Sequence, residues 1–92
     1  MAVYRILDLF CGAGGFSYGL EQNKNFKTVI GLDFEKAAIE TFNYNFKQAV
    51  GICGDITNKE TKDKIVSLAR ELKVNMIIGG HLAKVLALKA KI

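Results

Sequence analysis

Short apolar runs alternate with segments of helical periodicity along the first 78 residues, and this alternation limits the fold more than any other feature. Strands are predicted at four apolar runs, residues 4–10, 28–32, 50–53 and 74–78. Helices are predicted between them, at 16–22, at 35–46 and from a cap at Thr57 or Asn58 through Arg70. Strands that alternate with helices form parallel sheets with right-handed crossovers, so the chain is predicted to be α/β.

The composition excludes several classes of protein. No apolar run is long enough for a transmembrane helix, and Arg5 and Asp8 interrupt the stretch that a signal peptide would need. Cys11 and Cys53 lie far apart and His81 is the only histidine, which argues against a zinc site and a disulfide framework. We therefore expect a cytoplasmic protein with no metal and no membrane partner, in which both cysteines are small buried apolar residues.

The net charge of +4 is concentrated at the C-terminal end of the sequence. Residues 81–92 contain Lys84, Lys89 and Lys91 and no acidic residue, which leaves the first eighty residues at +1. Because that part is nearly neutral, charge alone does not indicate binding to nucleic acid. Proline is absent, whereas average usage would give roughly four or five.

A glycine-rich turn follows the first predicted strand, at the sheet edge where open α/β folds bind ligands. Gly12, Gly14 and Gly15 allow the backbone to turn tightly and to approach a ligand closely. The spacing is not GxGxxG, because Ser17 stands where the third glycine would be, so a dinucleotide site is not indicated. A turn without any ligand is the alternative.

Acidic residues follow the second and third predicted strands. Asp33 lies 19 residues after Gly14, close to the spacing at which a carboxylate holds a ribose diol. Phe34 comes next and would flank an adenine ring or serve as an ordinary aromatic of the core. Asp55 follows the third strand and would accept a hydrogen bond from an exocyclic amine. The alternative for both aspartates is a turn residue without a ligand.

Together these residues resemble the DNA (cytosine-5)-methyltransferases, which use S-adenosylmethionine. The segment 8–22, DLFCGAGGFSYGLEQ, is similar to the family's first signature, DLFxGxGGFxxGLxxxG. Asp33 is similar to the second signature, residues 54–57 (GDIT) to the third, and residues 74–80 (VNMIIGG) to the approach to the fourth. The resemblance implies a Rossmann-like methyltransferase fold over residues 1–80, incomplete after four parallel strands in the order 3-2-1-4.

The resemblance also implies a role for each residue at the strand ends. Phe10 and Phe34 would lie against the adenine of S-adenosylmethionine. Asp33 would hold the ribose hydroxyls, and Asp55 and Ile56 would contact the edge of the adenine. The backbone of the turn would line the same pocket, at Gly12, Ala13, Gly14 and Gly15. Because later segments complete the pocket in the family, we expect residues 1–92 alone to bind the cofactor weakly.

The sequence leaves the family pattern after Gly80. The family continues with Pro-Pro-Cys-Gln-Gly-Phe-Ser, whose Cys attacks C6 of a flipped cytosine, whereas this chain continues with His81. A one-base deletion explains the difference: CCA CCT TGC CAA GGT TTT AGC, without its first base, is translated as His-Leu-Ala-Lys-Val-Leu-Ala, the sequence of residues 81–87. The probability that residues 81–87 would match this frameshifted translation by chance is on the order of 1 in 10⁵. Residues 81–92 are therefore predicted to be a frameshifted tail outside the family pattern, and a genuine C-terminal helix is the alternative.

The expected activity is that of an intact family member, which transfers a methyl group from S-adenosylmethionine to C5 of cytosine in DNA, as in bacterial restriction–modification. The chain by itself is expected to be inactive, and no residue is assigned as catalytic; His81 has no partner for such a role. Two alternatives are a subunit of a split methyltransferase, completed by a second chain, and another Rossmann-like module that binds a nucleotide or S-adenosylmethionine. A downstream reading frame beginning near PPCQGFS would support the first, and tight NAD binding would support the second.

Overall fold

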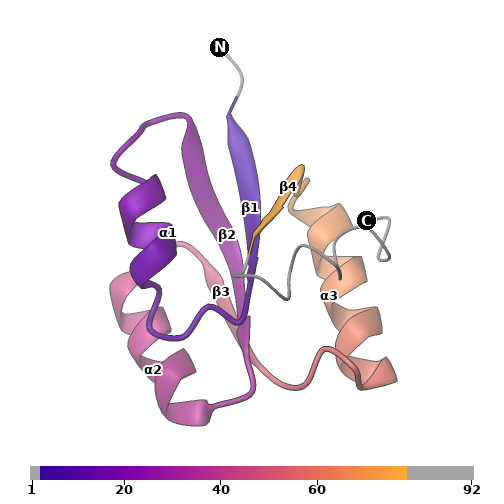
Figure 1. The fold of residues 1–92 in the computed structure, drawn as a ribbon. Coiled ribbons are helices and arrows are strands. Elements are labelled where there is room, and N and C mark those ends of the chain that lie inside the picture. The colour runs from indigo at the N-terminus through magenta and orange to yellow at the C-terminus, as the bar shows by residue number, and fades with distance from the viewer. Residues whose placement is uncertain (1–2, 79–92) are drawn as a thin grey trace.

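The computed structural model describes residues 3–78, which form a parallel four-stranded sheet between two layers of helices (Figure 1). The strands are β1 (Tyr4–Leu9), β2 (Phe26–Asp33), β3 (Val50–Cys53) and β4 (Met76–Ile78). The helices are α1 (Gly15–Leu20), α2 (Lys36–Asn45) and α3 (Lys59–Glu71). The predicted α/β class is confirmed, while the predicted tail at 81–92 lies outside the described residues.

The strand order is β3-β2-β1-β4, as predicted, and every neighbouring pair is parallel. The chain first winds from β1 outward through β2 to β3, and then returns to the other side of β1 to form β4. Open α/β sheets bind ligands in the crevice outside the carboxyl ends of the strands, where the order reverses. The carboxyl end of β1, which lies next to this reversal, and the strand ends beside it are therefore the part of this fold in which a site is expected.

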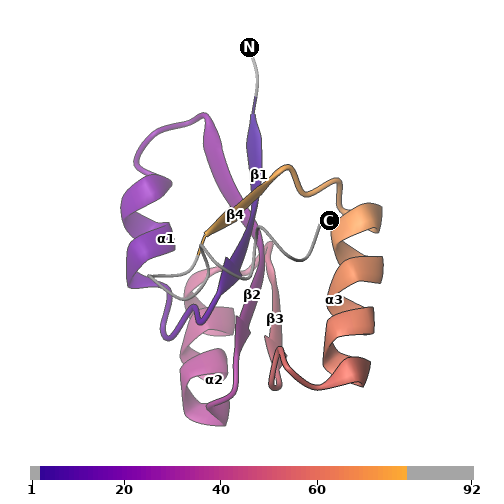
Figure 2. The same cartoon turned by 45° about the vertical axis from the view of Figure 1, so that its right-hand side comes forward.

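Apolar side chains cover both faces of the sheet. Helix α3 lies on one face, and α1 and α2 lie on the other (Figures 1 and 2). The α3 face contains the larger buried cluster: Leu7, Leu9, Val29, Ile30, Leu32, Ile52, Ile65 and Ala69. On the α2 face the absence of a side chain at Gly31 makes room for the Phe42 ring, since an added Cβ would lie 2.5 Å from its Cζ atom. The ring of Phe42 is fully buried and stacks on Phe46 at 4.7 Å between centroids.

The bounds of several elements differ from the sequence prediction by one or two residues, and at the ends of β4 and β1 the local reason is visible. Strand β4 begins at Met76, two residues late, because the Val74 amide still donates to the Ala69 carbonyl at the end of α3. Strand β1 ends at Leu9 because Phe10 already turns, with φ of +57°. Of the two predicted caps for α3, Asn58 is the one observed, and its side chain accepts from the Thr61 amide.

No helix within residues 3–78 has both the length and the apolar character needed to cross a membrane.

Candidate functional site

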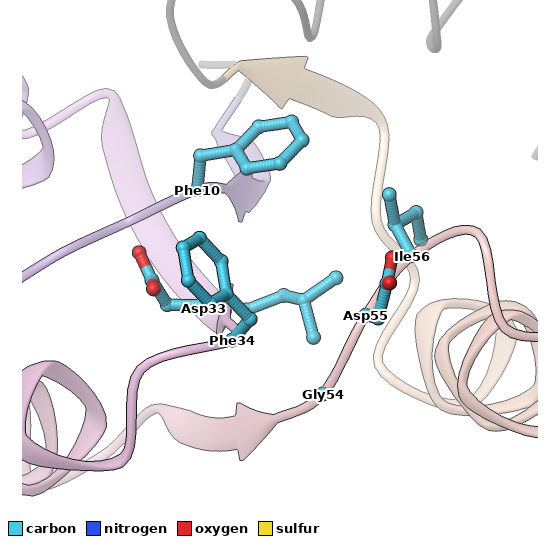
Figure 3. Close-up of a pocket in the computed structure, with 7 residues that line it drawn as sticks. Phe10, Asp33, Phe34, Gly54, Asp55 and Ile56 are labelled. Atoms are coloured by element: carbon cyan, nitrogen blue, oxygen red, sulfur yellow. The ribbon is translucent and has the colours of Figure 1, made fainter.

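A cavity of about 290 Å³ lies outside the carboxyl ends of the first three strands (Figure 3). Its lining combines apolar side chains with two carboxylates: Phe10, Leu32, Asp33, Phe34, Gly54, Asp55 and Ile56. In Figure 3 the carboxylates of Asp33 and Asp55 stand on opposite sides of the Phe34 ring. This arrangement suits a flat apolar group that carries hydrogen-bond donors at both ends.

The structure brings five of the nine predicted site residues together in this cavity: Phe10, Asp33, Phe34, Asp55 and Ile56. The other four belong to the glycine-rich turn. Ala13, Gly14 and Gly15 line a second hollow of about 320 Å³, together with Tyr18, Asn45 and Phe46. Gly12 is connected to the first cavity through its hydrogen bond to Asp33.

The carboxylate of Asp33 fastens two separate turns to each other. Its Oδ2 accepts from the Gly12 amide at 2.9 Å, and its Oδ1 accepts from the Glu35 amide at 2.9 Å. Gly12 adopts φ of +55°, a left-handed conformation that L side chains rarely take. A carboxylate oxygen has two lone-pair sites, so each oxygen of Asp33 can still accept a second hydrogen bond from a ligand.

The two aromatic side chains of the cavity are open to solvent. Phe34 is 71% exposed and Phe10 is 37% exposed, whereas the rings of Phe42 and Phe46 are buried. Phe10 also has a positive φ, which for a bulky residue costs on the order of 1–3 kcal/mol and is typical of functional sites. Two solvent-facing rings beside carboxylates indicate a site for a ligand with an apolar face.

Thr57 holds the second carboxylate of the cavity. The Thr57 amide and hydroxyl donate to Oδ1 of Asp55 at 2.9 and 2.7 Å. These two hydrogen bonds, the backbone one first, lower the pKa of Asp55 below 3.8. Asp55 is therefore an ionised acceptor at neutral pH.

A buried chain of polar groups supports the glycine-rich turn from below. The Ser17 hydroxyl on α1 donates to Oδ2 of Asp8 on β1 at 2.5 Å, and the Thr28 hydroxyl on β2 donates to Ser17 at 2.8 Å. All three residues are at most 2% exposed. Burial raises the pKa of Asp8, the Ser17 hydrogen bond opposes that shift, and the charge of Asp33 adds to it. This chain attaches α1, and with it the turn, to two strands of the sheet.

The two cysteines differ in their environment, and one prediction about them is wrong. Cys11 is buried as predicted, and its burial, with the charges of Asp8 and Asp33, raises the pKa of its thiol to about 12. Cys53 is exposed, contrary to the prediction. The alternation of β3 turns Ile52 toward the core and Cys53 away from it, on a strand that, among residues 3–78, pairs with β2 alone.

Some residues of the site were not predicted from the sequence. Leu32 forms part of the cavity wall although it belongs to an apolar run, and nothing in its sequence context distinguished it from core residues. Thr57 was considered as a helix cap and as part of the GDIT signature, but no role in the site was assigned to it. For the buried polar chain a signal did exist, because Asp8 places a charge within a strand that is otherwise mostly apolar.

A comparison with known families decides the membership of the chain. The model of the C-5 cytosine-specific DNA methylases matches residues 4–81. The chain belongs to this family. It is similar to the Type II methyltransferase M1.ScrFI of Lactococcus lactis subsp. cremoris, with 39% identity over 62 residues that cover 67% of this chain and 15% of that protein. It is also 32% identical over 75 residues to the Type II methyltransferase M.DdeI of Desulfomicrobium norvegicum, covering 82% of this chain and 17% of the relative.

Solved structures show the same fold as this methylase-family chain. One is described as a DNA modification methyltransferase encoded within a prophage of E. coli; it has a TM-score of 0.67 and 26% identity, over 83% of this chain and 22% of that one. A TehB-like SAM-dependent methyltransferase from Corynebacterium glutamicum has a TM-score of 0.51 and 24% identity, over 62% of this chain and 30% of that one. The present chain thus spans less than a third of each of these proteins and relatives.

S-adenosylmethionine is the cofactor of this methylase family, and the residues of the cavity fit its nucleoside part. Adenosine has a flat ring, a ribose diol that donates hydrogen bonds and an exocyclic amine that also donates. The cavity has two exposed aromatic rings, Phe10 and Phe34, and its two carboxylates lie on opposite sides of the Phe34 ring. The predicted Rossmann-like methyltransferase fold and the predicted cofactor are confirmed by the family and the fold.

Proposed function

We propose that this chain is the cofactor-binding part of a DNA (cytosine-5)-methyltransferase of a restriction–modification system, acting in the cytoplasm. An intact member would transfer the methyl group of S-adenosylmethionine to C5 of cytosine in DNA. The observation that carries the proposal is the cavity at the ends of β1, β2 and β3, where Asp33 and Asp55 lie on opposite sides of the Phe34 ring. Family membership supports the chemistry.

Each residue of the cavity has a defined part in this proposal. Asp33 accepts hydrogen bonds from the ribose hydroxyls through the lone pairs that Gly12 and Glu35 leave free. Phe10, Phe34 and Ile56 enclose the adenine, and Asp55 accepts from its amine. The bound cofactor supplies a methyl group on a cationic sulfonium, which a site with carboxylates favours. The turn at Gly12, Ala13, Gly14 and Gly15 lies against the rest of the cofactor.

We further propose that residues 81–92 are the product of a frameshift and that the 92 residues alone transfer no methyl group. No cysteine follows Gly79 and Gly80, and the family match ends at residue 81. Neither cysteine of the chain is placed to replace the nucleophile. The thiol of Cys11 is buried with a pKa of about 12, so it is protonated, and Cys53 lies beside Phe34 at the adenine end.

Titration with S-adenosylhomocysteine, followed by calorimetry or by amide chemical shifts, tests the cofactor site. We expect weak binding, because later segments of the family complete the pocket, and we expect Asp33→Ala to abolish it. Asp63→Ala is the matched control, since Asp63 is an exposed carboxylate on α3, outside the cavity, that is paired with Lys59. Tight binding that is indifferent to Asp33 would show that the pocket has been misplaced.

Incorporation of radiolabelled methyl groups into duplex DNA tests the absence of activity in the 92 residues. No incorporation is expected. Incorporation that survives both Cys11→Ala and Cys53→Ala would contradict the proposal. The nucleotide sequence from codon 75 onward tests the frameshift directly, and an open frame near PPCQGFS would also identify a second chain that completes the enzyme.

A further inference from the structure

The two oxygens of Asp55 are in different situations. Oδ1 accepts two hydrogen bonds, both from Thr57, so its two lone-pair sites are in use. Within residues 3–78 no hydrogen bond reaches Oδ2, and the carboxylate borders the cavity. A carboxylate that is held by one oxygen and free at the other has one defined direction in which it can accept.

We propose that Thr57 is a positioning residue that holds the free oxygen of Asp55 at the purine 6-position, so that the cavity selects a 6-amino purine over a 6-oxo purine. This inference rests on the proposed function, since it assigns the base that the cofactor site accepts. Thr57 itself does not line the cavity and acts only through Asp55.

The selectivity follows from hydrogen-bond chemistry. An ionised carboxylate only accepts hydrogen bonds, and the 6-amine of adenine donates one. A 6-oxo purine presents an acceptor at that position, and its nearest donor is the N1–H, one ring atom away. A freely rotating aspartate would turn to reach that donor, but the two hydrogen bonds from Thr57 oppose the rotation. The lowered pKa of Asp55 supports the same conclusion, because the acceptor stays ionised at neutral pH.

The size of the effect follows from the loss of one hydrogen bond to a charged group. Such a bond contributes about 1.5–3 kcal/mol, which corresponds to roughly 10- to 100-fold in affinity. We therefore expect the unsubstituted chain to bind S-adenosylhomocysteine roughly 10- to 100-fold more tightly than S-inosylhomocysteine, which differs only in the 6-oxo group.

The ratio of these two dissociation constants, measured by amide chemical shifts in titrations of folded chain, tests the role of Thr57. Thr57→Val removes the hydroxyl and should lower the ratio about tenfold, whereas Thr57→Ser keeps the hydroxyl and should preserve it. Thr41→Val is the matched control, because Thr41 is exposed on α2, outside the cavity, and its hydroxyl donates to the Ala37 carbonyl. A merely structural role for Thr57 would weaken both ligands equally and leave the ratio unchanged.

The outcomes separate this inference from the proposal beneath it. If the unsubstituted chain binds S-adenosylhomocysteine but Thr57→Val keeps the full ratio, the role of Thr57 is overturned and the cofactor site stands. If the unsubstituted chain binds neither ligand, the cofactor site itself fails, and this inference with it. If Thr57→Val does not fold, Asp55→Asn decides: its amide can donate to a 6-oxo group, so the ratio should fall toward one or reverse. A ratio unchanged by Asp55→Asn would refute the inference.

Discussion

Replacing Gly14 by alanine should destabilise the chain by about 2–5 kcal/mol, through two separate costs. Gly14 has φ of +95°, and a left-handed conformation costs an L residue roughly 1–2 kcal/mol. An added Cβ would also lie 2.3 Å from Cε2 of Phe46, whose ring is buried and stacked on Phe42. Overpacking of this kind typically costs about 1–3 kcal/mol.

The neighbouring glycines of the same turn provide matched controls. Gly12 has φ of +55° but no atom within 4 Å of an added Cβ, so Gly12→Ala should cost only the conformational part, about 1–2 kcal/mol. Gly15 has neither a positive φ nor a close neighbour, and it begins α1. Gly15→Ala should therefore be neutral, or stabilising by up to about 1 kcal/mol through helix propensity.

Urea unfolding, followed by far-ultraviolet circular dichroism, measures the three changes on one scale. The expected order of destabilisation is Gly14→Ala, then Gly12→Ala, then Gly15→Ala. A double-mutant cycle with Phe46→Leu isolates the steric part, and its coupling free energy should be about 1–3 kcal/mol. If Gly14→Ala costs no more than Gly12→Ala, or if the cycle shows no coupling, then Phe46 does not pack against the turn and the reasoning is refuted.

Three further predictions follow from the same packing. A thiol-reactive chromophore at about pH 8 should label exposed Cys53 but not buried Cys11, whose thiol has a pKa of about 12. Denaturant should make the Cys11 thiol reactive as well. Labelling of both cysteines in the folded chain would contradict this prediction. Burial raises the folded-state pKa of Asp8 above its ordinary value of 3.8, so the contribution of the Asp8 side chain to stability is fully present below pH 3.8 and is lost as the pH rises through the folded-state pKa. Asp8→Asn should therefore be more stable than the unsubstituted chain at neutral pH but not in acid, which urea unfolding at both pH values will measure. Gly31→Ala should cost about 1–3 kcal/mol in the same assay, because its Cβ would overlap the buried ring of Phe42, and a neutral result would mean that this ring is free to move.

The sequence predicted most of the fold because its signals are local. Alternating apolar runs and helical periodicity placed all seven elements, and the crossover rule led to parallel pairing. The errors also have local causes. The Val74 amide completes the end of α3 instead of starting a strand, and Phe10 takes a left-handed turn that periodicity cannot show.

The cavity was predicted as a list of residues, but its internal contacts were not. Strand ends on one sheet edge converge by topology, so Asp33 and Asp55 were expected together. The bond between Asp33 and the Gly12 amide joins residues 21 positions apart, and the overlap at Gly14 depends on a ring 32 positions later. No pattern in the sequence encodes either distance. The prediction that Cys53 is buried was wrong for a related reason, because the burial of an edge-strand residue depends on which face of the strand a later element covers.

The two carboxylates of the cavity are held in place by different kinds of structure, and this affects how each end of the site depends on the fold. Asp55 is fixed by Thr57, two residues away, so its position needs only a local turn. Asp33 is fixed partly by Gly12, which belongs to a different strand end and relies on the packing of β1 against β2. In the proposed cofactor site, loosening the sheet should therefore disturb Asp33 before Asp55. Under the proposed function, we therefore expect the buried polar chain from Asp8 through Ser17 to Thr28, which braces β1 and the glycine-rich turn, to influence cofactor affinity from outside the cavity.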